Sequence, residues 1–177
     1  MSSYSRTYQE DHNIDWFAVV DKTYCHFASG GTYLPDEVNK KEQNRKIQQY
    51  IAKKFLQLDK FPLDVSINSR YIDDVNLVKK NPFEERHFDI DYKDYIADAV
   101  YLGFYSYCYW GVDKWGGILY RLLAYPKKET KIGIDNTIEV PHLQSANFLT
   151  PTLNLENNRT IHEFVRVSLF PTLGEML

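Results

Sequence analysis

Two short runs of mainly hydrophobic residues, separated by polar ones, lie near the start of the chain. Residues 15–21 and 23–29 are both rich in aromatic and β-branched side chains, and they meet at Asp21 and Lys22. Two such runs joined by a very short polar turn are typical of an antiparallel hairpin. We therefore expect two paired strands here, the second ending at Gly30-Gly31.

The period changes after Leu34. Apolar residues recur every three or four positions up to Leu58, which is typical of a helix that packs one side against a sheet. Pro35 favours the start of this helix because its missing N–H would be unpaired at a first helical position, and the acidic Asp36 and Glu37 suit the positive end of the helix dipole. We predict a long amphipathic helix over about 35–58. Its outer side is basic and carries Lys40, Lys41, Arg45, Lys46 and Lys53.

Two further aromatic runs lie at 103–110 and 118–126, around a turn that contains three glycines. They predict a second antiparallel hairpin, whose ring surface favours recognition over catalysis. The alternation of residues 161–169 predicts a final strand. Shorter strands are expected over 65–71, 75–79 and 131–134.

Charge is most uneven between residues 84 and 98. This segment contains six acidic residues and only two basic ones, Arg86 and Lys93. The acidic residues are Glu84, Glu85, Asp89, Asp91, Asp94 and Asp98. Helical spacing predicts a shorter helix over about 91–101, in which Asp94 and Asp98 form a like-charge pair that is either solvated or bound by something basic.

Length and composition fit a single folded domain. The chain has 177 residues, of which 15% are aromatic and 25% charged, so it can bury a core without a disulfide scaffold. We predict one α+β domain over 15–177, with a mostly antiparallel sheet, and a flexible polar tail over 1–14. The first 14 residues hold no apolar run typical of a signal peptide, and the only cysteines, Cys25 and Cys108, suit a reducing compartment, so we expect a cytoplasmic protein.

Residues with catalytic potential are scattered. The five histidines show no metal-ligand spacing, Gly30-Gly31 lacks the rest of a phosphate-binding loop, and we expect no cofactor. Cys25 and His26 are adjacent on a strand and point to opposite faces, so they cannot form a nucleophile–base pair with each other. A small hydrolase that uses Cys25 or Cys108 with His26 remains an alternative. The net charge of −3 argues against a nucleic-acid partner.

The aromatic hairpin allows two interpretations. Tyr105, Tyr107 and Tyr109 could fill the core, whereas Trp110 and Trp115 bracket a turn where burial is difficult and where such rings act as interface anchors. A carbohydrate- or ligand-binding module that stacks its ligand on Tyr109, Trp110 and Trp115 is a further alternative.

Several of these segments together are similar to a known group of proteins. They are Asp15-Trp16-Phe17, His26-Phe27-Ala28-Ser29-Gly30-Gly31, Leu34-Pro35, Gly103-Phe104-Tyr105-Ser106-Tyr107, Tyr120-Arg121-Leu122, Tyr125-Pro126, Phe164 and Ser168. The chain resembles small bacterial immunity proteins, which are encoded beside polymorphic toxins of the contact-dependent growth inhibition and Rhs type. One departure is the first hairpin turn, which has Lys22-Thr23 where we expect a glycine.

The resemblance implies a non-enzymatic protein that binds the toxin domain of its own cell in a 1:1 complex and occludes its active site. Such toxin domains are often nucleases with basic substrate channels. Carboxylates that mimic phosphates and rings that fill apolar hollows would suit such a partner. The partner-binding residues that we predict are Glu84, Glu85, Asp89, Asp91, Asp94, Asp98, Tyr107, Tyr109, Trp110 and Trp115.

Overall fold

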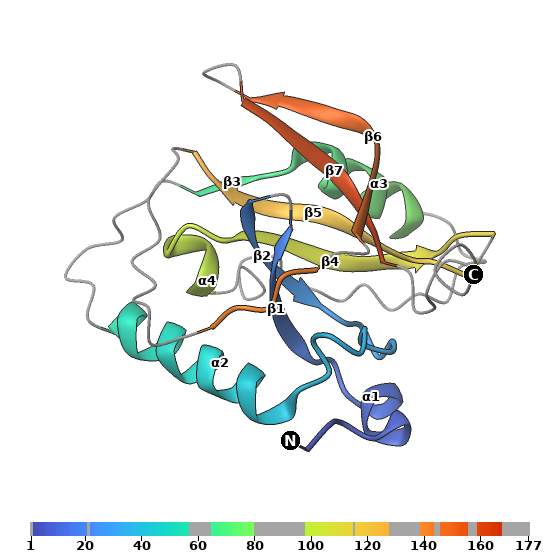
Figure 1. Cartoon of the computed structure of the whole chain (residues 1–177). Coiled ribbons are helices and arrows are strands. Elements are labelled where there is room, and N and C mark those ends of the chain that lie inside the picture. Colours follow the sequence, from blue (N-terminus) through green and yellow to red (C-terminus); the bar gives the residue numbers. More distant parts are fainter. Residues whose placement is uncertain are drawn as a thin grey trace, which may run out of the picture.

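One mixed sheet organises the molecule (Figure 1). The computed structural model describes residues 2–20, 22–56, 65–79, 98–114, 116–127, 139–143, 146–155 and 159–167. Within these ranges the sheet has seven strands, ordered β1-β2-β4-β5-β7-β6, and β3 pairs with β5 beside this path. The expected α+β class with a mostly antiparallel sheet is confirmed.

The first hairpin forms as its two aromatic and β-branched runs predict. β1 (Asp15–Val20) pairs with β2 (Thr23–Ala28) over all six residues, from Asp15↔Ala28 to Val20↔Thr23. Lys22, in the turn, has a φ of 64°, a left-handed conformation that two-residue hairpin turns require. β2 then pairs in parallel with β4, opposite Tyr105 to Cys108, while the other described pairs of strands are antiparallel.

The second predicted hairpin is also present. β4 (Tyr105–Val112) pairs with β5 (Ile118–Pro126), with bulges after Ser106 and Tyr109. The predicted final strand is β7 (Arg159–Val167), which pairs with β5 on one side and with β6 (Ala146–Leu155) on the other. No strand was expected over 146–155.

The edge of β5 that faces away from β4 is shared by two partners. Its first half pairs with β7 and its last three residues pair with β3 (Val65–Ile67). Asn68 fills the fork between them: its backbone N–H donates to Leu123 O at 2.8 Å and its side-chain amide donates to Leu122 O at 2.9 Å. The backbone N–H and the side-chain amide of Asn68 thus pair with two carbonyls in the interior of the protein.

The N-terminal segment is ordered against the domain, so the flexible tail predicted over 1–14 is wrong. Ser5 caps helix α1 (Arg6–Asp11) by accepting from Tyr8 N. Gln9 is buried and bridges two segments, since its amide donates to Tyr4 O while its carbonyl accepts from Leu34 N. The sequence of α1 does not indicate this packing, because its one buried residue, Gln9, is polar.

The helix expected over 35–58 is not confirmed at that length. Helix α2 spans Lys41–Leu56, and residues 57 and 58 lie outside the described ranges. Pro35 begins only a turn, in which its carbonyl accepts from Val38 N and Asn39 N. Val38 is fully buried at this turn, and α2 starts where Lys41 N donates to Ser2 O.

Helix α3 (Ser69–Lys79) replaces the strand that we expected over 75–79. Apolar residues recur at helical spacing from Tyr71 onward. The backbone carbonyl of the preceding Asn68 accepts hydrogen bonds from the N–H groups of Tyr71 and Ile72. Helix α4 (Asp98–Tyr101) covers the end of the helix expected over 91–101. The rest of that helix and the strand expected over 131–134 lie outside the described residues.

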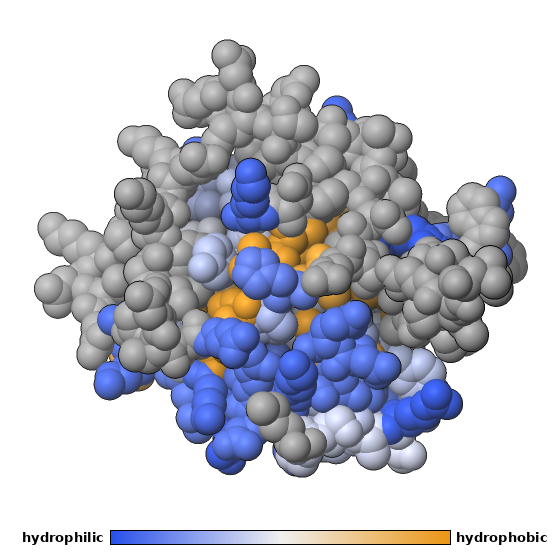
Figure 2. Space-filling model, in the orientation of Figure 1, coloured by the Kyte–Doolittle hydropathy of each residue, from blue (hydrophilic) through white to orange (hydrophobic). Residues whose placement is uncertain are grey.

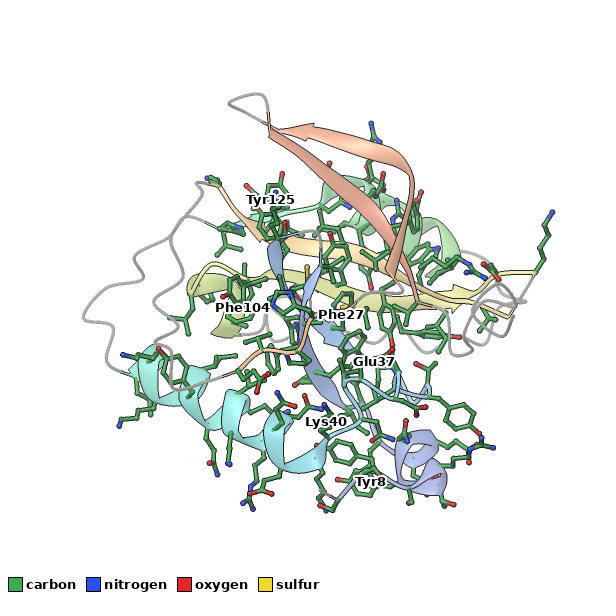
Figure 3. The ribbon with its side chains drawn as sticks, in the orientation of Figure 1. Tyr8, Phe27, Glu37, Lys40, Phe104 and Tyr125 are labelled. Carbon is green, nitrogen blue, oxygen red and sulfur yellow. The ribbon has the colours of Figure 1, made fainter. Side chains whose placement is uncertain are left out.

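Both faces of the sheet are buried. Alternation along β1 sends Trp16 to one face, where it stacks on Phe27 at 4.1 Å between ring centroids. Phe17 points to the other face and meets Phe104 there, edge to face, together with Ile47 of α2. Figure 3 shows Phe27 at the centre of the sheet and Phe104 on the side toward α2.

Hydrophilic residues cover the lower part of the surface in Figure 2, over α1 and α2, with apolar residues above them. Among the described helices, none is long and apolar enough to cross a membrane.

Candidate functional site

Most of the predicted acidic surface cannot be placed. Glu84, Glu85, Asp89, Asp91 and Asp94 lie outside the described residues, as does Trp115. Asp98 begins helix α4, which contacts α2, β4 and β5.

Tyr107 is a core residue and not part of a surface. It is 2% exposed, its ring stacks on Phe27, and burial raises its pKa well above the usual value. The structural interpretation of this residue is correct, and its assignment to a partner-binding surface is wrong. The aromatic run that predicts the strand fits either a buried or an exposed position for this ring.

Tyr109 is partly exposed and packs against the same core as Tyr107. Its ring lies over Gly30, where a Cβ atom would come within 2.8 Å of the tyrosine side chain. Gly30 also has a φ of 61°, so a glycine is needed there for backbone conformation and for space. The contact fixes the end of β2 to the hairpin.

Trp110, next in sequence, packs on a different cluster. Its ring centroid is 5.4 Å from that of Tyr71 on α3 and 4.5 Å from the Arg121 guanidinium. This cluster also contains Leu123 and the partly buried Cys108. Tyr109 and Trp110 are thus not gathered on one binding surface, contrary to the sequence-based expectation.

A buried network of charges lies beside Trp110. Arg121 and Glu163 are 3% and 1% exposed, and Arg121 Nη2 lies 2.7 Å from Glu163 Oε1. Arg121 Nε donates to the same oxygen, and its Nη1 donates to Asp74 Oδ2 at 2.5 Å. Glu163 Oε2 accepts from Arg70 Nη1 at 3.3 Å. Two arginines and two carboxylates therefore balance in charge.

Aromatic rings complete the surroundings of Arg121. Besides Trp110, the rings of Phe164 and Tyr71 have centroids 5.1 and 5.9 Å from the guanidinium carbon. Such rings attract a cation electrostatically and exclude water from it. Sequence analysis missed this network, since Arg121 and Glu163 are far apart in sequence. The one available signal was Arg121, the single charged residue of the otherwise largely apolar β5.

His26 links three strands on the helical side of the sheet. Its Nδ1 is 2.9 Å from Ser106 Oγ on β4, and its Nε2 is 3.2 Å from Asp15 Oδ1 on β1, at ion-pair distance but without hydrogen-bond alignment. This order of acid, imidazole and hydroxyl is that of a hydrolytic triad. However, His26 is 3% and Ser106 0% exposed, so no substrate carbonyl can reach the hydroxyl in this structure.

The two thiols are poorly suited to nucleophilic chemistry. Burial raises the pKa of Cys25 far above that of a free thiol. The pKa of Cys108 is raised to about 12, mainly by burial and also by the charge of Asp15. A hydrogen bond with Tyr71 lowers this pKa but does not offset the increase. A thiolate is the reactive form, so both residues are protonated and unreactive near neutral pH.

The tip of the β4–β5 hairpin is the most exposed part of the aromatic segment. Val112 is 57% exposed, and Lys114 beside it is also exposed. Below them the turn is held in place by Asp113, which accepts from Gly117 N at 2.8 Å and pairs with Arg166 of β7. The turn thus presents an apolar side chain on a fixed backbone.

Within the described ranges, no three His, Cys, Asp or Glu side chains are grouped so that they could hold a metal ion. Comparison with protein-family models, curated proteins and solved structures gives no match. Any function must therefore be argued from the residues and their arrangement.

Proposed function

We propose that this protein is a non-enzymatic, cytoplasmic immunity protein that binds a cognate antibacterial toxin domain 1:1 and blocks its active site. The observation that carries the proposal is the fixed tip of the β4–β5 hairpin, where Val112 and Lys114 are exposed, on a sheet in which Cys25, His26 and Ser106 are buried. Binding needs an accessible, fixed surface, and catalysis needs accessible reactive atoms.

Pre-organisation of this surface supports a binding role. Trp110 is held between Tyr71 and Arg121, and Asp113 ties the turn to Arg166. Side chains and loops that are already ordered lose little entropy when a partner docks, which favours tight binding. The resemblance to immunity proteins supports a toxin domain as the partner.

The first test is whether the purified protein binds and inhibits the toxin domain encoded immediately upstream. We expect a stable 1:1 complex and loss of toxin activity. Val112→Lys should weaken this complex, because it replaces an exposed apolar side chain with a charge at the proposed interface. Leu56→Lys is the matched control, since Leu56 is an equally apolar, 83% exposed residue on α2. Equal effects of both variants, or no complex at all, would contradict the proposal.

The acidic block has its own test. Asp94→Lys combined with Asp98→Lys should slow association with a basic toxin and reduce the salt dependence of the association rate, while dissociation changes less. Stopped-flow measurement at two ionic strengths checks this. An unchanged association rate would show that the acidic block is not part of the interface. The result with Val112→Lys would still test whether the hairpin tip is.

A further inference from the structure

Strands β6 and β7 separate from the rest of the sheet at the fork in β5. β7 pairs with β5 only from Phe164 to Val167, but it pairs with β6 along its whole length from Arg159. Beyond this point β3 takes the place of β7 along β5. Residues 152–155 and 159–162 therefore form a two-stranded extension, here called the arm, which leans away from β5 at the top of Figure 1.

The arm has an open hydrogen-bonding edge. β6 is the last strand in the sheet order, and within the described residues no strand pairs with its outer side. A two-stranded ribbon is marginally stable in water, and a third strand stabilises it by adding backbone hydrogen bonds. An open edge offers backbone N–H and C=O groups in the spacing that another strand needs.

The composition of β6 favours an identical strand as the partner. None of its ten residues is charged, although 25% of the whole chain is. Exposed edges that avoid pairing usually carry charges, especially lysine. When two copies of one strand pair about a two-fold axis, any charge near the axis meets its own copy, so an uncharged strand suits self-association. A different protein would instead be selected through complementary charges.

Pro151 limits where this pairing can occur. Proline has no N–H to donate, and β6 is irregular between Leu149 and Thr152. The regular part beyond it, Thr152 to Leu155, pairs residue by residue with β7 from His162 to Arg159. Thr152–Leu155 is therefore the segment of the edge that is free to add a strand.

We propose that two copies of this protein associate through antiparallel pairing of Thr152–Leu155 across a two-fold axis, which joins the two arms into a four-stranded ribbon. The paired segment is short, so the dimer is weak and forms as the concentration rises. The opposite face of the molecule, with α1 and α2, is not involved.

Sedimentation velocity on the full chain, from micromolar to near-millimolar concentration, tests the proposal. We expect a monomer–dimer equilibrium. Asn154→Lys should weaken the dimer about tenfold or more, because the new charge meets its own copy near the axis, and Asn154→Asp should do the same. An equimolar mixture of the two variants should associate again. Gln49→Lys on the exposed side of α2 adds the same charge elsewhere and should leave the equilibrium unchanged.

A cross-linking experiment reports the geometry directly. Asn154→Cys should form an intermolecular disulfide under mild oxidation, whereas Gln49→Cys should not, and circular dichroism of each variant shows that it is folded. A chain that stays monomeric over the whole concentration range would overturn the proposal. So would a dimer that Asn154→Lys leaves unchanged, or a failure of the mixed charge variants to associate. Binding of the arm to a foreign strand, with no self-association, would also overturn it.

Discussion

At the scale of single residues, Arg121 and Glu163 show how a charge pair can be placed inside this sheet. Removing two charges from water costs several kcal/mol each, and the cost is offset only when the geometry and the remaining hydrogen bonds are good. Here both oxygens of Glu163 and three nitrogens of Arg121 have partners, and rings enclose the guanidinium. The network joins α3, β5 and β7 at the fork.

Breaking this pair from one side should be costly. Arg121→Met leaves the Glu163 carboxylate buried with only the exposed Arg70, so we expect the free energy of unfolding to fall by about 3–5 kcal/mol. Arg70→Met is the matched control: its side chain is 58% exposed, and it should cost no more than about 1 kcal/mol. Urea denaturation measures both. Similar losses for the two variants would contradict the importance of the buried pair.

Alkaline pH should destabilise the fold through groups that are buried in neutral form. The pKa values of Cys108 and Tyr120 are raised to about 12, and those of Cys25 and Tyr107 are also raised, in each case mainly by burial. The unfolded chain loses these protons at lower pH, near 9 to 10. Stability is therefore fully present below about pH 9 and declines as the pH rises toward 12, by up to about 1.4 kcal/mol per pH unit for each group.

Urea denaturation at intervals between pH 7 and 11 checks this decline. Cys108→Ala removes one titrating group, so its stability should fall less steeply above pH 9 than that of the unaltered protein. A flat profile between pH 9 and 11 would mean that these groups are not neutral and buried in the fold.

Residue identity alone did not reveal the networks at this scale. The sequence singles out His26 for its chemistry, and its partner Asp15 lies across the predicted first hairpin, but Ser106 comes close only through the parallel pairing of β2 with β4. The same holds for Arg121 and Glu163. Contacts between residues that are distant in sequence need the strand order, which periodicity does not provide.

At the scale of elements, a sequence pattern predicts a strand or helix correctly where the pattern continues along most of the element. Aromatic and β-branched runs predict both hairpins, alternation predicts β7, and three- to four-residue spacing predicts the middle of α2. β6 was missed because Pro151 and two asparagines interrupt its apolar residues. Val75 to Lys79 by itself fits a short strand, but in the structure it is the second half of α3, which begins at Ser69.

Helix α1 depends on one buried side chain. Gln9 is 3% exposed and hydrogen-bonds to Tyr4 O and Leu34 N, whereas Gln49 on α2 is exposed. Gln9→Ala should therefore lower the free energy of unfolding by about 1–3 kcal/mol, because it leaves a buried N–H without its acceptor. Gln49→Ala should change it by no more than about 0.5 kcal/mol. Thermal and urea unfolding compare the two, and equal effects would contradict the anchoring role of Gln9.

At the scale of the whole molecule, the buried sheet separates a rigid core from the surfaces available to partners. Helices α2, α3 and α4 pack against one face, and the segment around Leu34 and Val38 packs against the other. Among the described residues, exposed features lie at the hairpin tip around Val112 and on the basic outer side of α2. A protein built in this way is suited to binding through its edges and turns.

The central claim is that this protein protects a cell from a toxin. The most direct measurement is bacterial growth when the toxin domain encoded immediately upstream is produced with this protein, with Val112→Lys, with Leu56→Lys, or alone. We expect growth with the unaltered protein and with Leu56→Lys, weaker protection with Val112→Lys, and arrest with the toxin alone. Arrest in the presence of the unaltered, folded protein would contradict the claim.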